Sequence, residues 1–170
     1  RYMIDEYEKL QAENGDNPYF VQAVVKNYVY KGPVLEWYIR IKLHLEHRYD
    51  ELDRLLPRRG TIVDVGCGYG QMSFLLAQRA AERQLLGVDY DEEKIALATH
   101  SFLCNDRTRF VCADVTTFDL PMADAFVIND MLHYVTPQEQ ERIMARCADR
   151  LVPGGVIVVR EGDRSCRDRH

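Results

Sequence analysis

Apolar residues are spaced differently on the two sides of residue 60. Before it, apolar residues recur every three or four positions, which predicts helices over residues 1–13, 19–29 and 34–56. Turns rich in Asn, Gly and Pro separate them. Part of the third segment also alternates like a strand, but its length and its content of Leu, Glu, Lys and Arg favour a helix.

After residue 60, short apolar runs alternate with helical segments. The runs predict strands over residues 61–65, 84–88, 109–113, 124–128 and 156–159. The intervening segments predict helices over residues 71–82 and 91–102, and from Thr136-Pro137 onward. We expect Asp91 to cap the second helix, Thr136 and Glu139 to form a capping box on the third, and Pro153-Gly154-Gly155 to form a turn.

Strands that alternate with helices predict an α/β fold, a Rossmann-like, doubly wound and mostly parallel sheet. We expect an N-terminal helical appendage over residues 1–59 and a core domain over residues 60–170. In such sheets a ligand binds beyond the carboxyl ends of the strands, where the strand order reverses.

Charge and cysteine content exclude several classes of function. The chain has 22 basic and 27 acidic residues, a net charge of −5, which argues against a broad nucleic-acid surface. The 5 cysteines form no CxxC pair and no zinc spacing, so we expect no metal and a reducing, cytoplasmic setting. No integral membrane segment or signal peptide is expected. The first residue, Arg1, suggests a processed piece or a module of a longer protein.

The candidate chemistry lies in a glycine-rich run, Asp64-Val65-Gly66-Cys67-Gly68-Tyr69-Gly70, between a predicted strand and a predicted helix. Glycines there permit positive φ, and the helix that follows presents free amides to a ligand. Asp89 and Asp114 come at the ends of the next two strands. The spacing GxGxG, with Gln71 where a nicotinamide site would carry glycine, argues against NAD(P).

Five motifs together resemble the class I S-adenosylmethionine-dependent methyltransferases. They are DVGCGYG, GVDYD, CAD, INDMLHYV and LVPGGVIVV, in order, within residues 60–162. The resemblance implies S-adenosylmethionine as cofactor and S-adenosylhomocysteine as product. It implies that the cofactor is bound by Asp64, Gly66, Gly68, Gly70, Asp89, Tyr90, Asp114, Val115 and Asn129.

His133 is the candidate catalytic residue. In small-molecule O-methyltransferases of plant phenol and bacterial polyketide type, a histidine in an LHDW-like run is the general base. The run here is LHYV, in which Leu-His matches and Asp-Trp is absent. An imidazole suits deprotonation of a phenol-like hydroxyl. The alternative is a histidine that only packs or caps a helix.

The aromatic N-terminal part suggests a lid over cofactor and substrate, as helices at this place often form in the family. Tyr28 and Tyr30 are the candidate substrate residues; the alternative is that these rings only pack the appendage against the sheet. Residues 17–42 also resemble, more distantly, bacterial methyltransferase modules of aryl-polyene and flexirubin-type pigment pathways.

The family normally has seven strands, and five are predicted here. Strands 6 and 7 are therefore expected to be missing from this chain, which leaves Val156–Val159 at an open edge. Because proteins avoid open edges, we expect a homodimer partner or a fused domain to cover it.

The function predicted from the sequence is methyl transfer from S-adenosylmethionine to a small molecule. We expect O-methylation, or C-methylation, of a phenolic or carboxylic compound. The alternatives are a non-catalytic module that binds S-adenosylmethionine within a larger protein and an NAD(P)-dependent reductase.

Overall fold

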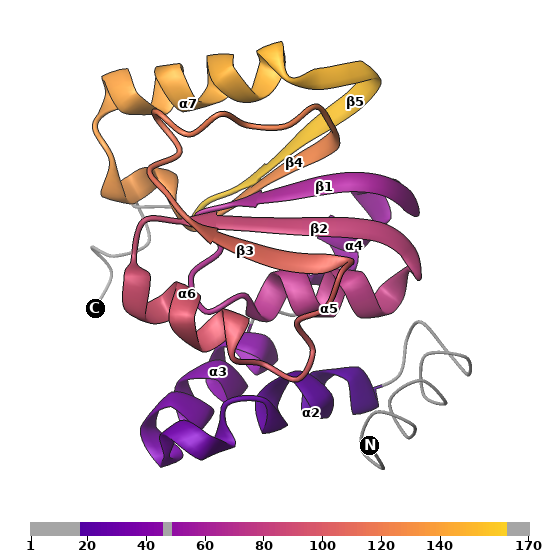
Figure 1. Cartoon of the computed structure of the whole chain (residues 1–170), viewed down its shortest axis with the longest axis vertical. Coiled ribbons are helices and arrows are strands. Elements are labelled where there is room, and N and C mark those ends of the chain that lie inside the picture. The colour runs from indigo at the N-terminus through magenta and orange to yellow at the C-terminus, as the bar shows by residue number, and fades with distance from the viewer. Residues whose placement is uncertain (1–17, 46–48, 163–170) are drawn as a thin grey trace.

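The structure is a computed structural model that describes residues 18–45 and 49–162 (Figure 1). The helix expected over residues 1–13 lies outside the described residues. In the described residues no helix is long and apolar enough to span a membrane.

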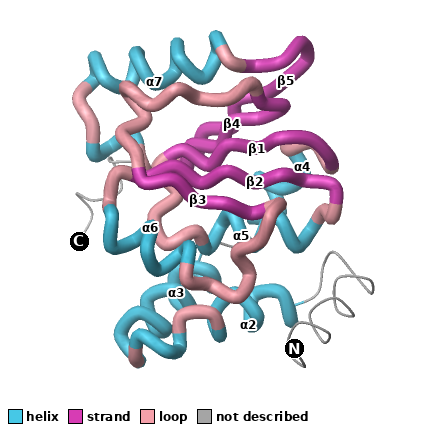
Figure 2. Tube along the Cα trace, viewed as in Figure 1, coloured by secondary structure: helices cyan, strands magenta, loops and turns pink. Residues whose placement is uncertain are grey.

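A five-stranded parallel sheet forms the centre of the molecule, with strand order β3-β2-β1-β4-β5 (Figure 2). The strands are β1 (Arg59–Val65), β2 (Glu82–Asp89), β3 (Thr108–Cys112), β4 (Ala123–Asn129) and β5 (Leu151–Arg160). Each of the five predicted strands is confirmed. The order reverses between β1 and β4, so their carboxyl ends define the switch point of the sheet.

Helices cover both faces of the sheet, as in a doubly wound fold. Helices α5 (Gln71–Arg79) and α6 (Glu92–Thr99) lie on one face, and α7 (Pro137–Asp149) lies on the other (Figure 1). Two buried clusters match these layers. One includes Phe74 and Leu75 of α5, and the other includes Ile143 of α7. The Rossmann-like fold class is therefore confirmed.

The N-terminal helices are α2 (Pro18–Lys26), the short 3-10 helix η1 (Val29–Lys31), α3 (Pro33–Leu45) and α4 (Tyr49–Leu55). They lie on the same face as α5 and α6 (Figure 1). The helical prediction for residues 34–56 is confirmed over α3 and α4, and residues 46–48 lie outside the described residues.

The apolar stripe with three- and four-residue spacing that includes Tyr38, Ile41, Tyr49 and Leu52 is buried in α4 but exposed in α3. Ile41 of α3 is 47% exposed, whereas Ile39 and Leu43 are buried, with Leu35 packed against the same cluster. Both stripes have helical spacing, so only the packing of α3 against its neighbours decides which one faces inward.

Strand β5 contains the predicted Pro153-Gly154-Gly155 turn within its length. Ala123 pairs with Leu151, but Ala125 pairs with Val156, so the extra residues form an irregularity in the strand and not a separate turn before it. In the described residues β5 pairs only with β4, and it lies at one edge of the sheet.

Candidate functional site

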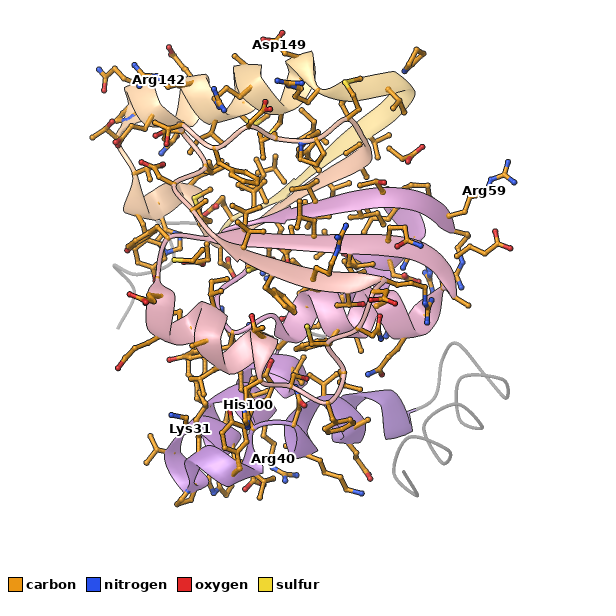
Figure 3. All side chains as sticks on the ribbon, viewed as in Figure 1. Lys31, Arg40, Arg59, His100, Arg142 and Asp149 are labelled. Carbon is orange, nitrogen blue, oxygen red and sulfur yellow. The ribbon has the colours of Figure 1, made fainter. Side chains whose placement is uncertain are left out.

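The candidate site lies at the carboxyl ends of β1, β2, β3 and β4. These ends converge on the left of Figure 1, opposite Arg59, which Figure 3 labels at the start of β1. The glycine loop, residues 66–70, leaves β1 there and leads into α5. The parallel sheet thus brings together residues that are far apart in the sequence.

The three glycines of the loop all have positive φ: 74° at Gly66, 56° at Gly68 and 78° at Gly70. A Cβ at Gly66 would stand 2.3 Å from Cγ of Met131, and one at Gly70 would stand 2.6 Å from the ring of Phe110. Nothing lies within 4 Å of a Cβ at Gly68. Packing therefore requires Gly66 and Gly70, while Gly68 borders open space that a ligand can approach.

Strand β2 holds the glycine loop in place. The carbonyl of Val88 accepts from the amide of Gly66 at 2.8 Å. The Asp89 carboxylate accepts from the amide of Gly68 at 2.8 Å and, through its other oxygen, from the amide of Asp91 at 3.0 Å. Asp89 is therefore fixed between the glycine loop and the start of α6, which Asp91 caps as predicted.

Asp64 lies beneath the glycine loop and is buried. Its carboxylate accepts from the Ser73 hydroxyl of α5 at 2.6 Å. Burial raises the pKa of Asp64 to about 6, the Ser73 bond lowers it, and the charge of Asp89 raises it. The carboxylates of Asp64 and Asp89 thus lie close together, the first under the glycine loop and the second beside it.

The end of β3 places Asp114 in an exposed turn. Its carboxylate accepts from both the amide and the hydroxyl of Thr116, at 2.8 and 2.7 Å, and these bonds lower the pKa of Asp114. Val115 is half-buried, and its carbonyl accepts from Arg146. Tyr90, after β2, is 78% exposed.

The end of β4 leads into the predicted INDMLHYV segment. Asn129, the last residue of β4, accepts a bond from Arg160 through its side-chain oxygen at 2.9 Å. Met131 packs over Gly66, so this segment adjoins the glycine loop. His133 lies in the 3-10 helix η2 (Leu132–Tyr134).

His133 has a carboxylate partner that sequence analysis missed. Its Nδ1 lies 2.8 Å from Oε2 of Glu161. The other oxygen of Glu161 accepts from the amides of Met131 and Leu132, at 2.8 and 2.6 Å. Burial acts to raise the pKa of Glu161, but the bonds from His133 and from the two amides together lower it. One signal points to Glu161: it follows the fifth strand directly, where site residues of such sheets gather.

The two candidate substrate residues lie in different places. Tyr28 is fully buried, its hydroxyl donates to the carbonyl of Tyr69 in the glycine loop, and burial raises its pKa. The ring of Tyr30 contacts His100 in a tilted arrangement, with centroids 5.0 Å apart and an interplanar angle of 48°. His100 lies at the end of α6 away from Asp91 (Figure 3). The structure therefore brings Tyr28 beneath the loop and leaves Tyr30 away from the strand ends.

No group of three or more His, Cys, Asp or Glu side chains in residues 18–45 and 49–162 could hold a metal ion. The arrangement at the strand ends instead offers a backbone loop, two neighbouring carboxylates and an imidazole–carboxylate pair. These groups can bind an organic cation and accept a proton.

Residues 62–155 match a family described as a methyltransferase domain. The chain belongs to this family. The resemblance to class I S-adenosylmethionine-dependent methyltransferases is thereby confirmed.

Curated relatives of this methyltransferase domain include carboxy-S-adenosyl-L-methionine synthases. Carboxy-S-adenosyl-L-methionine synthase from Shewanella baltica is 26% identical over 117 residues, which are 66% of this chain and 48% of the relative. The chain thus spans about half the length of the curated relatives it matches.

Among the solved structures that share the fold are an N-methyltransferase and a pyocyanin biosynthetic protein. The N-methyltransferase NodS from Bradyrhizobium japonicum matches with a TM-score of 0.62 and 21% identity over 73% of this chain and 72% of NodS. The pyocyanin biosynthetic protein PhzM matches with a TM-score of 0.64 and 20% identity over 78% of this chain and 41% of PhzM. At this identity the likeness concerns the fold of the methyltransferase domain.

Proposed function

We propose that this chain transfers a methyl group from S-adenosylmethionine to a hydroxyl of a small molecule, with His133 as the base. The observation that carries the proposal is the pairing of His133 with Glu161 beside the glycine loop. Membership of the methyltransferase family supports methyl transfer. The pairing of His133 with Glu161 supports an acceptor group that must lose a proton when it is methylated.

The proposed cofactor site combines the glycine loop with the ends of three further strands. The glycines face the methionine portion, and Asp89 takes the ribose hydroxyls. Tyr90, Asp114 and Val115 surround the adenine, and the Asn129 carbonyl faces the methionine ammonium. The full set is Asp64, Gly66, Gly68, Gly70, Asp89, Tyr90, Asp114, Val115 and Asn129.

The residues of this site fit a cationic cofactor. Asp64 is buried, and its pKa is raised partly by the neighbouring charge of Asp89. A ligand that carries an ammonium and a sulfonium would relieve this repulsion, whereas a pyrophosphate would add to it. The open space at Gly68 leaves room for a ligand against the loop. This argument favours S-adenosylmethionine over NAD(P).

His133 would work as a base through its Nε2 atom. If Nδ1–H donates a hydrogen bond to Glu161, Nε2 would be the ring nitrogen that takes the proton from the acceptor. S-adenosylmethionine supplies an activated methyl group, so the chain itself mainly has to align the acceptor and remove its proton.

The need for a base favours a phenolic over a carboxylic acceptor. A phenol ordinarily titrates near pH 10, so it needs a base at neutral pH, whereas a carboxylic acid is already ionised. A phenolate can also react at its ortho carbon, so C-methylation stays within the proposal. The distant resemblance to pigment-pathway modules remains a prediction.

The N-terminal part, residues 1–59, is proposed as a cover that supports the cofactor loop. Tyr28 donates to the Tyr69 carbonyl, and the rings of Tyr38 and Tyr69 meet edge to face at 5.9 Å. Tyr28 would thus affect the substrate site through the loop. A direct contact between Tyr30 and the substrate remains a prediction.

Binding of the cofactor is the first test. Calorimetric titration with S-adenosylmethionine and S-adenosylhomocysteine should show binding that Asp89→Ala weakens at least tenfold, with NADH as the negative control. The Asp89 side chain is expected to matter because it would hold both ribose hydroxyls. Binding of NADH in place of S-adenosylmethionine would contradict the proposal.

Turnover is the second test. The chain is incubated with S-adenosylmethionine and a panel of simple phenols and aromatic carboxylic acids, and S-adenosylhomocysteine is measured by mass spectrometry. General bases contribute about 10²- to 10⁴-fold, so His133→Ala should lower the rate by at least about 10²-fold with cofactor affinity unchanged. Equal rates for wild type and His133→Ala would remove His133 from the mechanism.

The same experiments separate two further candidates. A non-catalytic module would bind S-adenosylmethionine and transfer the methyl group to no acceptor. The Shewanella relatives are named as synthases of carboxy-S-adenosyl-L-methionine, and that activity would appear as a carboxylated cofactor in the mass spectrum.

We also propose that a second copy of the chain or a fused domain covers strand β5. Val156 and Val159 are 37% and 43% exposed, and β5 pairs with β4 alone in the described residues. Unpaired edges of this kind are usually shielded. The amides within Val156–Val159 that point away from β4 should be protected from hydrogen exchange in solution, and their full exchange would contradict the proposal.

A further inference from the structure

The last residue of β5 and the residue after it hold the whole segment that follows β4. Arg160 donates through Nη1 to the side-chain oxygen of Asn129 at 2.9 Å and to Oδ2 of Asp130 at 3.0 Å. The carbonyl of Arg160 accepts from the Asp130 amide at 2.8 Å. Glu161 then binds the next two amides and His133. Five consecutive residues are thus held by two.

Asp130 has an unusual backbone conformation between these two sets of contacts. Its φ is 52°, the one positive φ found at a non-glycine residue in the described part of the chain. Asp and Asn tolerate this left-handed region better than other side chains, but it still costs free energy, so surrounding contacts must maintain it. The contacts that do so here are those with Arg160.

We propose that Arg160 is a positioning residue for His133, an inference that rests on the proposed function of His133 as the base. Arg160 would act on His133 through Asp130, to whose carboxylate it donates and from whose amide its own carbonyl accepts. If the Arg160–Asp130 pair were lost, Asp130 would relax toward a more common conformation. The amides and imidazole that follow it would then leave Glu161.

The pairing of the strands explains why this position carries the arginine. Asn129 and Arg160 are register partners in the parallel ladder between β4 and β5. A side chain at this position of β5 therefore stands beside the residue at which β4 ends. The planar guanidinium can donate to two neighbouring oxygens at once, which a lysine ammonium does with less directional control.

Imidazole NMR tests the inference without any acceptor. The chain is labelled with ¹⁵N-histidine, and two-bond correlations are recorded at about pH 8, where a free imidazole is neutral. His133→Gln assigns the signals. Wild type should show His133 in one tautomer, with the proton on Nδ1. Arg160→Gln should shift these signals toward a mixture of both tautomers, and Arg160→Lys should restore them in part.

Arg150→Gln is the matched control, because Arg150 directly precedes β5 and pairs with the exposed Asp119. This control should leave the His133 signals unchanged. Wild-type signals in Arg160→Gln, or equal shifts in Arg150→Gln, would overturn the inference. If Arg160→Gln does not fold, Asp130→Ala removes the side-chain acceptor of the Arg160 guanidinium, and wild-type signals there would equally overturn it.

Calorimetry on the same variants separates this inference from the proposed function. Arg160→Gln should retain the S-adenosylmethionine affinity of wild type within about threefold while turnover of the phenol panel falls at least tenfold. Absence of cofactor binding in wild type would refute the proposed function and leave the NMR result intact. Wild-type turnover in Arg160→Gln would refute the positioning role alone.

Discussion

At the scale of single residues, Asp64 combines a charge with a buried position. Burial is the main cause that raises its pKa to about 6, and Asp89 adds to it, while the Ser73 hydroxyl opposes both. At neutral pH the folded protein therefore holds an ionised carboxylate where a neutral one would be more stable. A cationic ligand at the strand ends would offset this cost, in line with the proposed cofactor.

Asp64→Asn should stabilise the protein at neutral pH. The pKa of Asp64 in the folded protein lies above its pKa in the unfolded chain. The stability that Asp64 contributes is therefore fully present below about pH 4 and is lost as the pH rises through about 6. A shift of about two units corresponds to about 3 kcal/mol at most. Urea unfolding should show the variant more stable than wild type at about pH 7.5 and equal to it near pH 4.

Asp119→Asn serves as the control, because Asp119 is exposed. It should change stability little at either pH. The same Asp64→Asn protein should bind S-adenosylmethionine more weakly, since one of the two carboxylates near the cofactor is gone. An Asp64→Asn protein less stable than wild type at about pH 7.5 would show that the charge is held by contacts stronger than the Ser73 bond.

At the scale of elements, α7 shows how local sequence fixes a helix start beside the site. Thr136 accepts from the amide of Glu139 at 3.3 Å, and Glu139 accepts from the amide of Thr136 at 2.8 Å. Pro137 stands in the first turn. The predicted capping box is thus confirmed. The capping box therefore fixes the point at which the segment that carries His133 ends and α7 begins. Its first residue, Thr136, lies three positions after His133.

Thr136→Ala should destabilise the protein by about 1 kcal/mol, because the Glu139 amide loses its acceptor. Glu139→Gln is the matched control. A glutamine can replace glutamate in the capping box, so Glu139→Gln should destabilise the protein less than Thr136→Ala. Urea unfolding measures both. A larger loss in Glu139→Gln than in Thr136→Ala would show that the charge near the helix start matters more than the cap.

At the scale of the whole molecule, a buried arginine joins the N-terminal helices to the sheet. Arg83 in β2 is fully buried and donates to the Asp53 carboxylate in α4. It also donates to the carbonyls of Pro57 and of Leu76 in α5. Residues before and after position 60 also share one hydrophobic cluster, as Tyr28 and Phe74 illustrate. Mutations at this junction should therefore affect both parts.

Arg83→Met should cost roughly 3 to 5 kcal/mol, because it removes the buried partner of the Asp53 carboxylate and leaves the carbonyls of Pro57 and Leu76 without their donor. Arg58 contacts the same carboxylate but is 62% exposed, so Arg58→Met should cost about 1 kcal/mol or less. Denaturant unfolding compares the two variants with the double variant Arg83→Met/Asp53→Asn, which should recover part of the loss. Equal costs for the two single variants would refute a special role for the buried arginine.

Much of the fold could be predicted from the sequence because its signals are local. The strands, the caps at Asp91 and Thr136 and the glycine loop depend on spacing and turn chemistry within about ten residues. The inward face of α3 could not be predicted, since Ile41 and Ile39 lie on stripes of equal periodicity and the neighbouring helices choose between them.

The sequence by itself determined the order of the elements, the doubly wound class and the strand ends at which the candidate residues lie. Only the tertiary structure decided which of these residues meet. Glu161 reaches His133 across 28 positions and Tyr28 reaches the glycine loop across 41. The parallel sheet makes these encounters, because it gathers the ends of separate strands at one edge, and no local pattern records which side chains then touch.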